Sequence, residues 1–341
     1  MTITPFKILL ILITILQLPL VSSASALLSS SIVNEDDLSV LEHLKILSSN
    51  EFLGRKFASQ GSIKSQTYLV STLCALKVQA FKNKYRHTFT QPGFFQTKQG
   101  TNIIAYIPGT QHVNKYIVLS AHYDHLGTKR NTVYNGADDN ASGTSALLHY
   151  AKLLAKKPLK HSVILLFTDG EEVNLLGAKA FITQQKNILS NIKLNINLDM
   201  IAGSKRIKKL HFISRGLPQI LSTQSLGELI KLQAHFKTNS SAHLKAGFSN
   251  RGGAGTSLKR TNWLMASDHG VFNKAAVPFI YFGVGTHKNY HSEFDDFVNI
   301  NQNFYLAAID IIFKQLIYID TAMNKESIVE SVIPSLKKTQ R

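Results

Sequence analysis

Histidines and carboxylates follow several apolar segments of the chain, at the points where predicted strands end. The run YIVLSA leads into His122, VILLF leads into a stretch with Glu171 and Glu172, LNINL leads into Asp199, and FIYF precedes His291. Because the carboxyl ends of strands in an open α/β sheet line its ligand crevice, we expect these side chains to meet there. Imidazole and carboxylate donors without thiolates suit the zinc site of a hydrolase better than a structural zinc.

The donor types also indicate which residues could bind metal and which could support a ligand or accept a proton. Two histidines and three carboxylates can hold two ions if one carboxylate bridges them. Asp124 follows His122 by two residues, so an extended backbone puts both on one face, where the carboxylate can fix the tautomer and direction of the ring. Glu171 and Glu172 are adjacent and must point differently, so one can bind metal while the other accepts a proton.

Apolar runs of strand length alternate with helical stretches in the remainder of the chain. This alternation predicts an α/β fold, a three-layer αβα sandwich with a central mixed, largely parallel sheet flanked by helices. We expect strands at 102–107, 116–121, 162–168, 194–198, 210–213 and 278–282, and helices at 34–47, 62–76, 142–155, 175–184, 217–235 and 303–320. The polar, Gly-rich stretch 236–262 is expected to be a long surface loop.

The first residues have the pattern of a secretory signal. Lys7 is followed by an apolar run from Ile8 to Val21, and Ala24 and Ala26 stand in the A-x-A arrangement that a signal peptidase accepts. We expect residues 1–26 to be removed, the protein to be exported to the periplasm or secreted, and no membrane span to remain; an uncleaved anchor is the alternative. The folded domain is then expected at 27–324 and a loosely ordered basic tail at 325–341.

The charge balance is strongly basic, with 38 Lys and Arg against 21 Asp and Glu. The basic residues are scattered, with short clusters only at 205–209 and 337–341. Without a nucleic-acid-binding motif, this composition favours a solvated basic surface, or loose attraction to an anionic envelope, over specific nucleic-acid binding. Cys74 is the only cysteine, which excludes an internal disulfide, and its apolar neighbours predict a buried helix face.

Five motifs in order resemble peptidase family M28. They are a His-x-Asp after a strand, a Gly-Ala-Asp-Asp-Asn-Ala-Ser-Gly turn, a Glu-Glu pair, an Asn-Leu-Asp-Met and a late His. In this chain they stand at 122–124, 136–143, 171–172, 197–200 and 290–292. Gly54-Arg55 and 61–68 are similar to the family's N-terminal helix region. The resemblance spans roughly residues 50–320.

The resemblance implies the role of each site residue. His122 and Asp199 would hold one zinc ion, Glu172 and His291 the other, and Asp139 would bridge the two. Among the remaining residues, Glu171 would be the general base toward a metal-bound water, Asp124 would support His122, Tyr290 would stabilise the oxyanion, and Asp268 and His269 would lie near the substrate. Asp138 is expected to be a neighbour and not a ligand, and His125 to be structural.

The implied function is that of a di-zinc aminopeptidase acting on peptides with a free N-terminus. A glutaminyl cyclase-like enzyme with a single zinc is one alternative, although the Asp-Asp-Asn-Ala-Ser-Gly turn is closer to the peptidase form. A dipeptidase or carboxypeptidase of the same family is another. An inactive binding domain on the same fold is the non-enzymatic alternative, against which the intact ligands and Glu171 argue. The sequence gives neither the oligomeric state nor the side-chain preference.

Overall fold

A computed structural model describes residues 35–93, 96–248 and 261–323. The predicted signal peptide and the predicted basic tail lie outside these ranges. None of the helices within them combines the length and the apolarity that a membrane span requires.

Nine strands of the described residues form one mixed sheet, with the order β1-β3-β7-β4-β8-β11-β9-β10 and with β2 paired to β3. The central strands β7, β4, β8 and β11 run parallel, and antiparallel pairing begins on both sides of them. The strands are β1 Gln79–Ala80, β2 Arg86–Gln91, β3 Lys98–Ile107, β4 His112–His122, β7 His161–Thr168, β8 Ile192–Leu198, β9 Lys209–Arg215, β10 His243–Ala246 and β11 Phe279–Gly283, with a separate hairpin of β5 Gly127–Lys129 and β6 Thr132–Tyr134.

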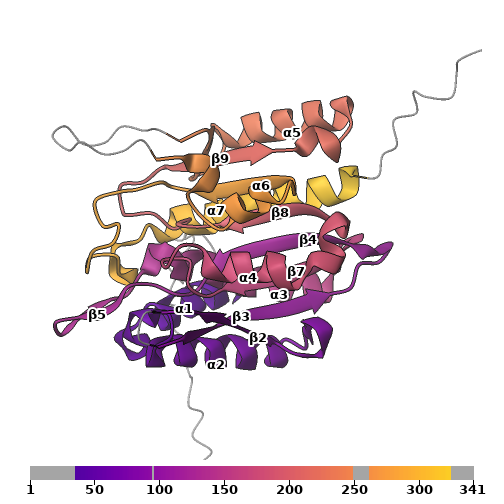
Figure 1. Ribbon diagram of the computed structural model, residues 1–341. Coiled ribbons are helices and arrows are strands. Elements are labelled where there is room, and N and C mark those ends of the chain that lie inside the picture. The colour runs from indigo at the N-terminus through magenta and orange to yellow at the C-terminus, as the bar shows by residue number, and fades with distance from the viewer. Residues whose placement is uncertain (1–34, 94–95, 249–260, 324–341) are drawn as a thin grey trace, which may run out of the picture. The chain divides into compact units, whose positions relative to one another are not determined.

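Helices cover both faces of this sheet (Figure 1). Their bounds are α1 Glu35–Leu47, α2 Gln60–Ala75, α3 Gly143–Lys156, α4 Leu176–Gln184, α5 Thr223–Phe236, α6 His269–Lys274 and α7 Gln302–Ala322. Apolar residues of α1, α2, α3, α5 and α7 belong to one buried cluster, and those of α4 and α6 to a second. The predicted three-layer sandwich is therefore the observed fold.

The strand sequences explain why both faces are covered. Along β7, Val163, Leu165 and Phe167 belong to the larger cluster, whereas Ile164 and Leu166 belong to the smaller one. Successive side chains of a strand point to opposite faces, so a continuous apolar run requires a layer of helices on each side. This run of β7 and its equivalents in β4 and β8 fix the central strands in the middle of the molecule.

All six predicted strands are present, and three other predictions need correction. Cys74 is exposed, not buried, because α2 turns Leu69 and Leu73 toward the core and the next residue away from it. The predicted helix 217–235 starts late, since Ser222 caps α5 with its side chain and a short turn precedes it. The predicted loop 236–262 contains β10, which pairs with β9.

Candidate active site

The strands that carry the predicted donors end at the same edge of the sheet. β4 ends at His122, which pairs with Thr168 at the end of the parallel strand β7. β8 is followed at once by Asp199, whose backbone N–H bonds to the carbonyl of Phe282 in β11. Parallel pairing therefore brings the residues after four strands together, as the sequence predicts.

Asp139 lies between two histidines that come from opposite sides of the site. Its Oδ1 is 3.4 Å from His122 Nε2, and its Oδ2 is 3.1 Å from His291 Nε2. His122 Nε2 is also 3.4 Å from Asp199 Oδ1, and His291 Nε2 is 3.2 Å from Glu172 Oε2. One carboxylate thus has an oxygen toward each of two donor groups, which is the arrangement a bridging ligand requires.

Two groups of side chains could each hold a metal ion, because the donor atoms within each group all lie within 4.8 Å of one another. One contains His122, Asp199 and also Glu171, and the other contains Asp139, Glu172 and also His125. The structure therefore brings together all five predicted ligands, with Glu171 beside the first group. His125 joins the second group through Nδ1, 2.9 Å from Glu172 Oε1.

The family model described as "Peptidase family M28" matches residues 102–316, which is more than half of the chain. The chain therefore belongs to peptidase family M28. A curated relative from Pyrenophora teres f. teres, named a probable zinc metalloprotease, is 27% identical over 62% of this chain and 47% of its own length. Leucine aminopeptidase 2 of Trichophyton equinum is 25% identical over 63% of this chain and 44% of its own. The M28 chain therefore spans about half the length of these relatives.

Solved structures share the fold of this M28 chain. A zinc aminopeptidase from Bacillus subtilis gives a TM-score of 0.59 at 15% identity, over 82% of this chain and 94% of that one. A glutaminyl cyclase from Bacteroides thetaiotaomicron gives 0.61 at 18% identity, over 85% and 98%. At these identities the likeness concerns the fold alone, and it includes both an aminopeptidase and a cyclase.

The chemistry of the M28 site fits cations. Among the described residues, Asp139, Glu172 and Asp199 form ion pairs with histidines and not with lysine or arginine. Burial raises the pKa of Glu171 well above its ordinary range; His122 opposes this shift, while Asp199 adds to it. Buried charges are stable when they are paired or coordinate metals. The excess of buried carboxylates is therefore what divalent cations would offset.

The histidines respond to the same excess of carboxylates. Burial opposes the charged form of His122, yet Glu171 and Asp199 raise its pKa well above the usual value. His291 is likewise opposed by burial, and its contacts with Asp139 and Glu172 raise its pKa to about 10. A metal ligand must be a neutral imidazole, so a bound cation would replace the proton that these carboxylates favour.

The bridging turn is fixed by residues that the sequence analysis did not single out. Asp295 accepts the backbone N–H of Asp138 on Oδ1 at 2.9 Å and that of Asp139 on Oδ2 at 3.0 Å. His287 Nε2 lies 2.8 Å from Asp138 Oδ2. Asp138 Oδ1 accepts from the backbone N–H groups of Ala202 and Gly203 at 2.7 and 2.8 Å. Asp138 therefore joins the turn to the loop after Asp199, in keeping with its predicted place as a neighbour.

Asp124 contacts the Glu-Glu pair as well as His122. Its Oδ1 accepts the backbone N–H of Glu171 at 3.0 Å and lies 3.7 Å from His122 Nδ1, which is beyond hydrogen-bond length. His122 Nδ1 is closer to the backbone carbonyl of Asp124, at 3.1 Å. The carbonyl thus orients the ring, while the carboxylate fixes the start of the acidic pair.

The three remaining predicted residues lie at different depths. Tyr290 is 37% exposed and its ring stacks on His291, with centroids 3.8 Å apart. Asp268 is fully buried and accepts from the hydroxyl of Thr168, close enough to raise the pKa of Glu171. His269 is fully buried behind Tyr281, 4.2 Å between centroids, with Nε2 2.8 Å from the carbonyl of Trp263. The structure does not bring His269 to the metal donors.

His125, which the sequence analysis expects to be structural, lies in the second group of candidate donors. The signal was present, because His125 ends the run His-Tyr-Asp-His directly after a strand. Its ring packs against Gly136, where an added Cβ would lie 2.5 Å from the ring and where φ is +56°. Only glycine suits that position, and its absent side chain leaves the room in which the His125 ring faces Glu172.

Proposed function

We propose that this M28 chain is an exported di-zinc aminopeptidase that removes residues from the free N-terminus of peptides. The observation that carries the proposal is Asp139, whose two oxygens face His122 and His291 at 3.4 and 3.1 Å. The similarity to leucine aminopeptidase 2 of Trichophyton equinum favours aminopeptidase activity.

Five residues would hold the two ions. His122 and Asp199 would bind one, His291 and Glu172 the other, and Asp139 both. When bound, zinc ions lower the pKa of a coordinated water and polarise a carbonyl. The five residues offer imidazole nitrogens and carboxylate oxygens and include no cysteine, which suits such a site.

Glu171 is the proposed general base. It lies beside His122 and Asp199, outside the contacts that Glu172 makes with His125 and His291. We propose that its carboxylate takes a proton from the attacking water and gives it to the departing amine. Asp124 would keep Glu171 in place through the backbone bond to Glu171 N–H, and Tyr290 would donate to the developing oxyanion.

Removing the metal tests the proposal. We expect a chelator to abolish hydrolysis of aminoacyl chromogenic amides and added zinc to restore it, with two equivalents bound at saturation. Elemental analysis and activity should be measured on the same samples, with N-acetylated amides as the control for a free N-terminus. Full activity in a demonstrably metal-free sample, or equal cleavage of acetylated amides, would contradict the proposal.

A glutaminyl cyclase is the second candidate, favoured by the fold shared with the Bacteroides thetaiotaomicron enzyme. It would bind one zinc and release no free amino acid. Incubation with a peptide that begins with glutamine separates the two: mass spectrometry would find loss of the first residue for an aminopeptidase and loss of ammonia for a cyclase.

His125 should matter for metal binding at the second group. We expect His125→Phe, which keeps a ring but removes the nitrogen facing Glu172, to weaken zinc affinity by about 10–100-fold. His125→Asn can place an amide nitrogen near the position of Nδ1 and should lose less. Competition with a chromophoric chelator measures both affinities without any activity assay. Equal zinc affinity of wild type and His125→Phe would contradict the role.

Export is proposed from the sequence pattern alone. The Ala24-x-Ala26 arrangement after the apolar run predicts that the mature chain starts close to residue 27. N-terminal sequencing of the protein recovered outside the cytoplasm tests this. Recovery of a membrane-bound form that still begins at Met1 would favour an anchor.

A further inference from the structure

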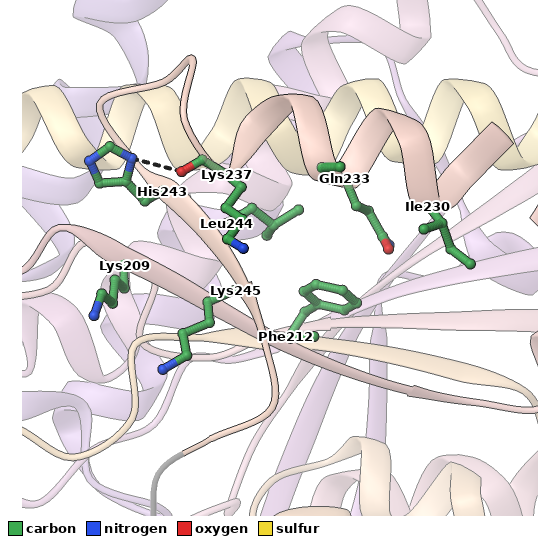
Figure 2. A pocket seen from close by; sticks show the side chains of 10 residues that line it. Lys209, Phe212, Ile230, Gln233, Lys237, His243, Leu244 and Lys245 are labelled. Atoms are coloured by element: carbon green, nitrogen blue, oxygen red, sulfur yellow. Dashed lines mark hydrogen bonds between the residues drawn. The ribbon is translucent and has the colours of Figure 1, made fainter. Parts of the chain in front are cut away.

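A groove lies between α5 and the edge strand β10, on a part of the sheet that carries none of the proposed metal ligands (Figure 2). Its volume is about 760 Å³. We call it the α5–β10 groove, and it is lined by Lys209, Phe212, Ile230, Gln233, Ala234, Lys237, His243, Leu244, Lys245 and Ala246.

The side of the groove beneath α5 is apolar. Phe212 and Leu244 lie on the same face of β9 and β10, and both belong to the larger core cluster. Ile230 and Ala234 lie one helical turn apart on α5 and face the same groove. Ile230 is 63% exposed, so a large apolar side chain beside the groove remains in water. Binding sites for side chains are typically concave and lined by apolar groups, which is the character of this side of the groove.

Among the described residues, no strand pairs with β10 on the side away from β9. His243 N–H donates to the carbonyl of Lys208 and Gly247 N–H to that of Phe212, both at 2.8 Å. Alternate residues of a strand bond to the same side, so the N–H and C=O groups of Leu244 and Ala246 point the other way. Since β10 ends the strand order of the described residues, this edge can pair with one more strand.

The charge around the groove has one sign. Lys209, Lys237 and Lys245 line it together with His243, and none of its lining residues is acidic. A second copy of this chain would set the same lysines against one another, which is unfavourable. An acidic partner would instead be attracted by them.

We propose that the α5–β10 groove binds an extended segment of a partner protein as an added strand along β10, with apolar residues alternating with Asp or Glu. An added strand points successive side chains to opposite faces of the sheet. One set enters the apolar space under α5, against Ile230 and Leu244. The other set meets Lys245 and Lys209, which lie on the opposite face because their neighbours Leu244 and Leu210 are buried beneath α5. The proposal is independent of the proposed peptidase activity.

Fluorescence anisotropy with short labelled peptides tests the proposal. An N-acetylated peptide that alternates Val and Glu should bind, whereas one that alternates Val and Lys, and one with the Val and Glu residues in two blocks, should bind at least about tenfold more weakly. Equal binding of all three peptides, or no binding of the first, would overturn the proposal.

Three variants in the groove and one control outside it locate the binding. Lys245→Glu should weaken binding of the Val-Glu peptide at least about tenfold, while Lys115→Glu, an exposed lysine outside the groove, should not. Ile230→Asp should weaken it through the apolar side. Ala246→Pro removes an outward N–H that β9 does not use, so it should abolish strand addition and leave the melting temperature unchanged. Binding that survives Lys245→Glu and Ile230→Asp would overturn the proposal.

Two other occupants remain distinguishable in the same experiments. A dimer in light scattering that Ile230→Asp disrupts would assign the groove to a second copy. Flotation with phosphatidylglycerol vesicles, lost in Lys245→Glu while the peptide fails to bind, would assign it to a membrane surface. Either result overturns the peptide proposal, and hydrolysis of aminoacyl amides by the three variants should stay at the wild-type level.

Discussion

Replacing Glu171 with glutamine should leave the zinc content unchanged while turnover falls by about 10²–10⁴-fold. Glutamine keeps the shape of the side chain but cannot accept a proton. The higher end of the range is expected because the same group would serve first as base and then as acid. Elemental analysis and initial rates on one preparation give both quantities.

Glu172→Gln is the matched control, one residue away. Glu172 contacts His125 at 2.9 Å and His291 at 3.2 Å, within the second donor group. A neutral amide is a poor zinc ligand, so this variant should lose metal. The two variants are thus separated by metal content more than by activity. If Glu171→Gln lost zinc and Glu172→Gln kept it, the proposed roles would be reversed. Glu171, beside His122 and Asp199, would then be the metal ligand.

Replacing Arg55 with methionine should lower the free energy of unfolding by about 3–5 kcal/mol. Arg55 is buried, and its guanidinium donates to four backbone carbonyls, those of Tyr123, Leu47, Asn135 and Gly136, at 2.8, 2.7, 2.5 and 2.8 Å. Methionine fills much of the volume but removes all four hydrogen bonds, and within the described part of the chain only the carbonyl of Gly136 keeps another donor, the backbone N–H of Ala141 at 3.1 Å. Urea unfolding followed by circular dichroism measures the loss.

Arg86→Met, an exposed position in β2, is the control and should change the unfolding free energy by less than about 0.5 kcal/mol. Arg55 also joins the end of β4 to the segment before the bridging turn, so its loss should weaken zinc binding. Equal stability of the two variants would show that the four carbonyls find other partners.

The strands and the ligands that follow them could be predicted because both depend on local patterns. An apolar run such as that of β7 specifies a strand buried on two faces, and parallel pairing then brings the residues after it to one edge. The short edge strand β10 was not predicted, since His243–Ala246 contains no apolar run and is held by pairing with β9.

The supports of the site could not be predicted, because they depend on contacts distant along the chain. Asp295 fixes the N–H of Asp139 from 156 residues away. Nothing near Asp295 in sequence marks it as different from an ordinary surface carboxylate. Similarly, the position of His125 against Glu172 depends on the space left by Gly136, which only the packed structure reveals.

The segment after β11 contributes to the site in two ways: it supplies a candidate ligand, and it holds the bridging turn in place. His291 contacts Asp139 and Glu172, while His287 and Asp295 of the same segment fasten the turn that carries Asp139. Movement of this segment would therefore displace His291 and release the turn that carries Asp139 at the same time. When the segment opens, the amide hydrogens of Asp138 and Asp139 lose their bonds to Asp295 and become exchangeable with solvent. The rate of deuterium uptake at these two amides would therefore report how often the site opens in the native protein.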